Sequence, residues 1–223
     1  DALITAKNLY DYGYNVKILT TSVREREGLY LKYYQKCIKS KIKILSKSKI
    51  KKIKTPNLII DGILGTGFKK KVREELIFII NWINKSKSIV LSIDVPSGLN
   101  TDSGTVDNLA VNADFTLTIE NLKVGMVFRE GKNQSGVVKI AKIGFPVEAK
   151  LLLGGLRWKM FNESLAFRLL RKPKVDINKY NSGKVLIIAG SKGMTGASIL
   201  ATHAALRAGA GMTISVVPSS LNN

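Results

Sequence analysis

The chain has 223 residues, of which 45% are apolar, 23% charged and 7% aromatic, and its formal net charge is +20. This composition excludes intrinsic disorder, and the length fits one complete domain plus part of another. The apolar runs fall far short of the roughly 18 residues of a membrane span. We therefore expect no contact with a membrane. The single cysteine, Cys37, cannot form an internal disulfide, and no signal peptide is visible, so we expect a cytoplasmic protein. The opening on Asp1 without a Met predicts a segment of a longer protein.

The first third of the chain predicts alternating helices and strands. Residues 2–12 have apolar side chains at helical spacing and are followed by Gly13, which predicts a helix that ends there. Residues 16–20 read as a short strand, and the lysine-rich stretch that follows is expected to hold a helix. From Leu58, a β-branched strand runs into a glycine loop.

The middle of the chain repeats this order. A helix is predicted over 74–86, with acidic residues in its first turn, and strands are predicted over 88–94, 113–120 and 136–146. Strands that alternate with helices indicate a mainly parallel α/β sheet, in which ligands bind at the carboxyl ends of the strands. The loops that become candidate walls of a site are therefore 61–71, 94–104 and 189–198.

No regular pattern is visible over 146–178, which predicts a crossing between domains. A single β, loop, α, β unit follows from Lys184, too little for a domain. The only histidine, His203, falls in its alanine-rich helix and is expected to be a packed or capping residue. Neither a zinc cluster nor a Ser, His and Asp triad can be built around it.

Half of the excess positive charge is concentrated in residues 32–54, which hold ten lysines and no acidic residue. Such a run suits nucleic acid or an anionic membrane. Against this, the chain has 28 lysines and only eight arginines, whereas bidentate phosphate recognition favours arginine. Lysines also alternate with isoleucines here. We therefore expect a solvated amphipathic face, in a helix or an edge strand, and no nucleic-acid partner.

Two carboxylates follow predicted strands directly, at the positions where parallel sheets place reacting groups. Asp61 and Asp94 both precede glycine-bearing turns, and Ser97 lies three residues after Asp94. Either carboxylate alone could simply cap its turn. Together with Ser97, they could form an oxygen-rich cavity for a hard cation or an acid–base site.

The loop GTGFKKK combines free backbone amides at Gly65 and Gly67 with Lys69, Lys70 and Lys71 ahead of a helix. Amides at a helix start and ammonium groups suit a phosphate. The loop matches neither the P-loop spacing nor GxGxxG, so the motif alone is weak.

Longer segments allow the chain to be compared with a family. The stretch from DGILGTGFKKK through DVPSGLN, followed by ADFTLTIENLKVGM and SGVVKIAKIGFP, closely resembles the NAD(P)H-hydrate (NAD(P)HX) epimerase domain over about residues 1–146. The stretch YNSGKVLIIAGSKGMTGASILATHAALRAGAGMTISVVP is similar to the opening of the ADP-dependent NAD(P)HX dehydratase domain. Their order resembles that of bifunctional nicotinamide-nucleotide repair enzymes.

The resemblance implies an organisation and an activity. Residues 1–150 would form a Rossmann-like, three-layer epimerase domain and 151–178 the crossing, while 179–223 would open a ribokinase-like dehydratase domain. The epimerase interconverts the R and S forms of the C6 hydrate, and the complete dehydratase removes water from the S form while hydrolysing a nucleotide. The implied cofactors are potassium and ADP or ATP, the implied substrates are NADHX and NADPHX, and a homo-oligomer is expected.

The resemblance also assigns site residues by position. Potassium ligands correspond to Asp61 and Ser97. Asp1 corresponds to the last residue of an NNGGD loop, whose Asn would be a further ligand upstream. Substrate contacts fall on Asp94, on Ala197 of the second domain and on one loop: Gly65, Thr66, Gly67, Phe68, Lys69, Lys70 and Lys71. We expect Asp94 to be the catalytic residue, because both hydroxide loss and ring opening need a proton shuttle at the hydroxyl group.

Two other classes of function remain open. A nonenzymatic Rossmann-like module would bind a dinucleotide or a partner without turning over the hydrate. A nucleic-acid binder would use the lysine-rich stretch and would shift DNA in a salt-dependent way.

Overall fold

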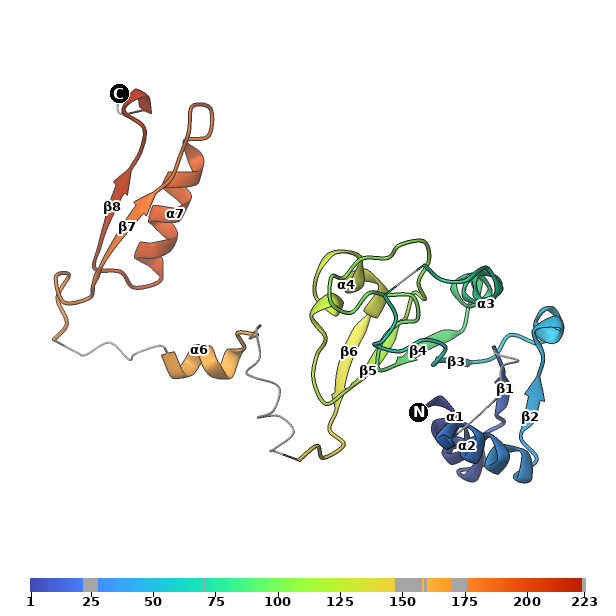
Figure 1. Ribbon diagram of the computed structural model, residues 1–223. Helices are drawn as coiled ribbons and strands as arrows, with labels where there is room; N and C mark the ends of the chain where they lie inside the picture. Colours follow the sequence, from blue (N-terminus) through green and yellow to red (C-terminus); the bar gives the residue numbers. More distant parts are fainter. Residues whose placement is uncertain (22–27, 70, 147–157, 159, 170–175, 222–223) are drawn as a thin grey trace. The chain divides into compact units, whose positions relative to one another are not determined.

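The structure is a computed structural model that describes residues 1–21, 28–69, 71–146, 158, 160–169 and 176–221. The chain divides into two compact units, Asp1–Trp158 and Lys159–Asn223 (Figure 1). No helix in the described ranges is both long and apolar enough to cross a bilayer.

The first unit is built around a four-stranded parallel sheet, as the alternation of elements predicted. Its strands lie in the order of the sequence, with every neighbouring pair parallel: β3 (Leu58–Asp61), β4 (Ile89–Ile93), β5 (Phe115–Ile119) and β6 (Val137–Ala141). All four carboxyl ends therefore lie at one edge, and Asp61 pairs in register with Ser92. This edge brings the loop after β3 next to the loop after β4.

Helix α3 (Glu74–Lys85) covers one face of this sheet. Glu74 and Glu75 occupy its first turn, where their negative charges interact favourably with the positive end of the helix dipole. Its apolar stripe is buried and forms the main core with Ile59 of β3 and Val90 of β4; the stripe consists of Leu76, Ile79, Ile80 and Ile83. Apolar side chains three or four residues apart share one side of a helix, which is why this segment was predictable.

Helix α4 (Arg129–Ser135) contacts the same face, where the hydroxyl group of Thr116 donates to the carbonyl of Ser135 at 2.7 Å. Before it, the short 3₁₀ helix η2 (Val124–Met126) buries Met126 against Val95 and Leu99. On the opposite face, several apolar side chains are 40–53% exposed: Leu58, Ile89, Phe115, Leu117 and Val137. The described residues thus show a helical layer on one face, and a third layer stays a prediction.

The N-terminal part of the first unit contains two further helices and a separate parallel pair of strands. The elements in chain order are α1 (Ala2–Asp11), β1 (Lys17–Leu19), α2 (Gly28–Lys39), β2 (Lys43–Leu45) and the 3₁₀ helix η1 (Lys47–Lys52). The lysine-rich stretch thus forms part of a helix and then a strand. Its apolar side chains Ile42, Leu45 and Ile50 are buried, while Lys41, Lys43 and Lys49 are exposed, so the predicted solvated amphipathic face is confirmed.

The single cysteine offers a test of the packing of α2 against α1. Cys37 is fully buried and its thiol donates to the carbonyl of Leu3 at 3.5 Å. Burial raises the pKa of this thiol, and the nearby positive charge of Lys7 only partly opposes the rise. Because the thiolate is the reacting form, we expect a disulfide reagent at pH 8 to modify the native protein far more slowly than the urea-unfolded protein. Equal rates in the two states would show that α1 does not cover Cys37.

The second unit contains the predicted β, α, β arrangement. Strands β7 (Lys184–Ile188) and β8 (Met212–Val216) are parallel and are connected through α7 (Gly196–Arg207). His203 is exposed on α7, so the expectation of a packed or capping residue was wrong. Two strands leave most of the helix surface uncovered.

Two short helices of this unit were not predicted, namely α6 (Glu163–Leu169) and the 3₁₀ helix η3 (Ser219–Leu221). At the start of α6, the side chain of Asn162 accepts from the amide of Leu165 at 2.9 Å. An asparagine in this position caps a helix start.

Candidate functional site

Asp61 ends β3 in a buried position, with 1% of its surface exposed. Its Oδ1 accepts from the hydroxyl group of Ser97 at 2.6 Å, and its Oδ2 accepts from the Ser97 amide and the Ser92 hydroxyl group, both at 2.8 Å. Burial raises the pKa of this carboxyl group, although these hydrogen bonds act in the opposite direction. No lysine or arginine of the described segments forms an ion pair with Asp61. The structure thus brings the two predicted cation ligands into direct contact.

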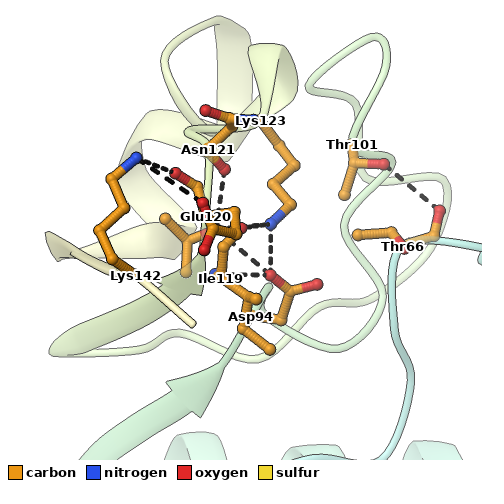
Figure 2. Close-up of polar contacts among 9 residues, drawn as sticks. Thr66, Asp94, Thr101, Ile119, Glu120, Asn121, Lys123 and Lys142 are labelled. Atoms are coloured by element: carbon orange, nitrogen blue, oxygen red, sulfur yellow. Dashed lines mark hydrogen bonds and ion pairs between the residues drawn. The ribbon is translucent and has the colours of Figure 1, made fainter. Parts of the chain in front are cut away.

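The loop after β3 is held against the loop after β4 by side chains of the latter. The Leu64 amide donates to the Ser97 hydroxyl group at 2.9 Å. The Thr101 hydroxyl group donates to the Thr66 carbonyl at 3.4 Å (Figure 2). Asn108 binds Val72 twice, accepting from its amide at 2.9 Å and donating to its carbonyl at 3.0 Å. These contacts fix both ends of the predicted phosphate-binding loop.

The predicted residues within this loop have different surroundings. Gly65, Thr66 and Gly67 are exposed, whereas Phe68 is half-buried and packs against the main core. Lys69 forms an exposed ion pair with Asp102 at 2.7 Å, which raises the pKa of its ammonium group. Lys71 is exposed, and Lys70 lies outside the described residues.

Asp94 follows β4 with an unusual backbone conformation. Its φ is +67°, a left-handed value that costs a residue other than glycine about 1–3 kcal/mol and that is found at functional sites. Its Oδ1 accepts from the Ile119 amide at 2.9 Å, from the Thr118 hydroxyl group at 3.4 Å and from the ammonium group of Lys123. No donor in the described part of the chain contacts Oδ2. The turn therefore presents one saturated and one available carboxylate oxygen.

Lys123 was not singled out from the sequence. Its ammonium group also donates to the Thr118 hydroxyl group and to the Ile119 carbonyl, both at 2.9 Å, so its three protons point to three oxygens (Figure 2). Such a fully bonded ammonium group has a fixed position. It balances the charge of Asp94 and orients the carboxylate.

A pocket of about 510 Å³ opens at this edge of the sheet. Polar groups of Asp94, Lys123 and Thr66 meet apolar side chains in its lining, which consists of Asp1, Thr66, Asp94, Ile119, Glu120, Asn121, Leu122, Lys123, Ile143 and Phe145. The available Asp94 oxygen can exchange a proton with a bound hydroxyl group, and the apolar side chains can contact a flat ring.

The lining of this pocket includes neither Ala197 nor the predicted cation ligands Asp61 and Ser97. Ala197 is an exposed residue in the first turn of α7 and belongs to the second unit. Within the described ranges, no group of three or more histidine, cysteine, aspartate or glutamate side chains could hold a metal ion. The oxygens around Asp61 therefore come from one carboxylate and neighbouring hydroxyl groups.

Comparisons with known proteins show which family this chain resembles. Residues 1–125 match the family described as YjeF-related protein N-terminus. The bifunctional NAD(P)H-hydrate repair enzyme Nnr of Dictyoglomus turgidum is 36% identical over 170 residues, which cover 76% of this chain and 33% of the relative. Nnr of Moorella thermoacetica is 30% identical over 226 residues, which cover 98% of this chain and 42% of the relative. The chain thus spans less than half the length of these relatives.

A solved structure supports the fold. The crystal structure of yeast ynu0, YNL200c, matches with a TM-score of 0.59 and 22% identity, covering 72% of this chain and 68% of that chain. The likeness and the parallel sheet are consistent with a Rossmann-like fold. The family match extends over more than half of the residues of this chain, and the chain therefore belongs to the family of YjeF-related protein N-termini.

Proposed function

We propose that the first unit interconverts the R and S forms of NAD(P)H hydrate and that Asp94 is its proton shuttle. The observation that carries this proposal is the Asp94 carboxylate, which has one oxygen held by Lys123 and the Ile119 amide and the other available at a pocket. The relatives are named NAD(P)H-hydrate repair enzymes, and these names suggest the substrate class.

Epimerisation can break either of two bonds at C6, and both routes transfer a proton between the hydroxyl oxygen of the hydrated ring and a protein group and later transfer it back. In ring opening, the carboxylate takes the hydroxyl proton, the C6 oxygen forms a carbonyl double bond as the bond from C6 to the ring nitrogen breaks, and the nitrogen takes up a proton; closure on the other face of the carbonyl reverses these steps. In hydroxide loss, a protonated Asp94 gives its proton to the hydroxyl group, the bond from C6 to oxygen breaks to release water, and the lone pair of the ring nitrogen forms an iminium bond to C6. Water then adds to C6 on the other face, and its proton goes back to Asp94. A single carboxylate beside the ring serves both routes.

Lys123 keeps the carboxylate in position during this exchange. Its ammonium group, held by the Thr118 hydroxyl group and the Ile119 carbonyl, cannot turn towards solvent without losing both contacts. A carboxylate fixed in this way reacts from one geometry, which lowers the entropic part of the barrier.

We further propose that Asp61 and Ser97 hold a potassium ion. The donor set fits a hard monovalent cation, because it consists of oxygens and includes a buried carboxylate that pairs with no lysine or arginine among the described residues. When bound, the ion would supply positive charge beside the phosphate groups of the dinucleotide.

Potassium should therefore stabilise the protein through Asp61. At a concentration about 100 times the dissociation constant, a ligand that binds only the folded state adds about 2.7 kcal/mol to the free energy of unfolding. We expect thermal unfolding to shift upwards when potassium chloride replaces choline chloride at equal ionic strength. In Asp61→Asn this shift should disappear, whereas the exposed Asp107→Asn variant should keep it. A full shift in Asp61→Asn would reduce Asp61 to a cap of its turn, to which the Ile63 amide donates at 3.3 Å.

For the second unit we propose the opening of an ADP-dependent dehydratase domain of ribokinase-like fold. The support is the β7, α7, β8 arrangement with Ala197 at the start of the helix, together with the word bifunctional in the names of the relatives. The complete domain would use ADP or ATP to dehydrate the S form. A cytoplasmic location for this repair stays a prediction from the sequence.

The direct test of the first proposal is the conversion of one epimer into the other. The purified R form of NADHX is incubated with the full-length protein, and the S form is followed by chromatography at a pH where the uncatalysed exchange is slow. We expect the S form to appear in proportion to protein concentration. Binding of the dinucleotide with no rate above the uncatalysed one would instead support the nonenzymatic module.

A further inference from the structure

We propose that Glu120 is a positioning residue that fixes residues 143–145 as the apolar wall of the Asp94 pocket, on which the heterocyclic ring of the dinucleotide lies. This inference rests on the proposed function, and it concerns a residue that takes no part in the proton exchange.

Glu120 follows β5 with an unusual geometry for a charged residue. Its φ is +60° and only 3% of its surface is exposed. Its backbone is fixed to β6 and the residue after it, since its amide donates to the Ala141 carbonyl at 2.8 Å and the ammonium group of Lys142 donates to its carbonyl at 2.7 Å. The backbone thus holds the glutamate close to the segment that leaves β6.

One oxygen of this side chain collects three consecutive backbone amides. Oε1 accepts from Ile143 at 2.6 Å, from Gly144 at 2.8 Å and from Phe145 at 3.3 Å. Gly144 has a φ of +81°, which glycine adopts without strain and which lets successive amides converge. Hydrogen bonds to a charged acceptor are stronger than neutral ones, and these define the path of a segment that is neither helix nor strand.

The segment that Glu120 fixes forms part of the wall of the Asp94 pocket. Ile143 and Phe145 both line this pocket, yet 59% and 51% of their surfaces remain exposed. These two apolar side chains are exposed at the same pocket as Asp94 and Lys123, and together they form a surface suited to a flat ring. Without the carboxylate of Glu120, the three amides would turn towards solvent and this wall would lose its fixed shape.

The experiment compares Glu120→Ala with the conservative Glu120→Gln. Glu120→Ala should raise KM for NADHX by about tenfold and leave kcat within about threefold, because it loosens a binding wall and spares the proton shuttle. Glu120→Gln keeps an oxygen that can accept the amides, so its KM should stay within about threefold of wild type. Glu130→Ala, an exposed glutamate on α4, is the matched control and should behave as wild type.

A second readout does not depend on activity. Hydrogen exchange at the amides of 143–145 should accelerate in Glu120→Ala and remain slow in Glu120→Gln and in the control. If Glu120→Ala fails to fold, Phe145→Ala tests the wall itself and should show the same rise in KM. An unchanged KM together with unchanged exchange in Glu120→Ala would overturn the inference. A wild-type protein without epimerase activity would instead refute the proposed function, and the exchange data would still decide whether Glu120 holds this segment.

Discussion

Replacing Asp94 with asparagine should lower kcat for epimerisation by roughly 10²- to 10⁴-fold, which is the usual contribution of a general acid or base. The amide oxygen of asparagine can still accept from the Ile119 amide and from Lys123, so the contacts of Oδ1 survive. Asparagine also tolerates the left-handed φ of +67° better than most residues. The change therefore removes proton exchange and little else.

The measurement is the rate of R to S conversion, combined with thermal unfolding of each variant. Asp94→Asn should unfold within a few degrees of wild type, which separates a lost proton shuttle from a lost fold. Asp107→Asn introduces the same chemical change at an exposed position on the connection between β4 and β5 and should retain the wild-type rate. Near wild-type turnover in Asp94→Asn would show that another group moves the proton.

The part of the site that the sequence predicted follows from one rule of parallel sheets. Asp61 and Asp94 were selected because each ends or follows an apolar strand, and the structure places both at the carboxyl edge of β3 and β4. The direct contact between Asp61 and Ser97 was not predictable from spacing. It depends on a tight turn that carries Ser97 back over β3. The strand ends alone suggested only that Ser97 and the two carboxylates share one oxygen-rich cavity, and the resemblance to a family named Asp61 and Ser97 as ligands of one ion.

The missed residues share a physical cause. Lys123 and Glu120 act on partners more than 20 positions away, Asp94 and the segment after β6, so their roles arise from the register of β4, β5 and β6. One lysine among 28 carries no composition signal. One signal was available for Lys123: it lies a few residues after the end of a predicted strand. The carboxyl ends of neighbouring parallel strands meet at one edge of the sheet, so a lysine in this position can reach the residues that follow the neighbouring strand.

Helix α4 was missed for a different reason. Its sequence, REGKNQS, has no apolar periodicity. The helix is fixed by close approach, since a Cβ added at Gly131 would lie 1.8 Å from the Gly125 carbonyl oxygen, and by the Ser135 hydroxyl group, which donates to the Gly131 carbonyl at 2.7 Å. Packing of this kind overrides local propensity.

Gly98→Ala should lower the free energy of unfolding by roughly 2 to 5 kcal/mol, the sum of backbone strain and overpacking. Gly98 has a φ of +97°, and a Cβ built on it would lie 2.2 Å from the Leu109 carbonyl oxygen and 2.9 Å from the Ala110 Cα. Neither neighbour is the flexible end of a side chain. The backbone itself must therefore move.

That movement should reach the site, because Gly98 directly follows Ser97. The Ser97 carbonyl accepts from the Val111 amide at 2.9 Å, so the segment 109–111, which blocks the new Cβ, also holds the serine in contact with Asp61. We therefore expect Gly98→Ala to lose both stability and the response to potassium. Urea unfolding with and without potassium measures the stability and the potassium response together.

Gly65→Ala is the matched control, since nothing lies within 4 Å of its added Cβ, and its stability should change by less than about 0.5 kcal/mol. Equal stability of the two variants would mean that the turn after β4 is not packed against Leu109 as tightly as the structure shows.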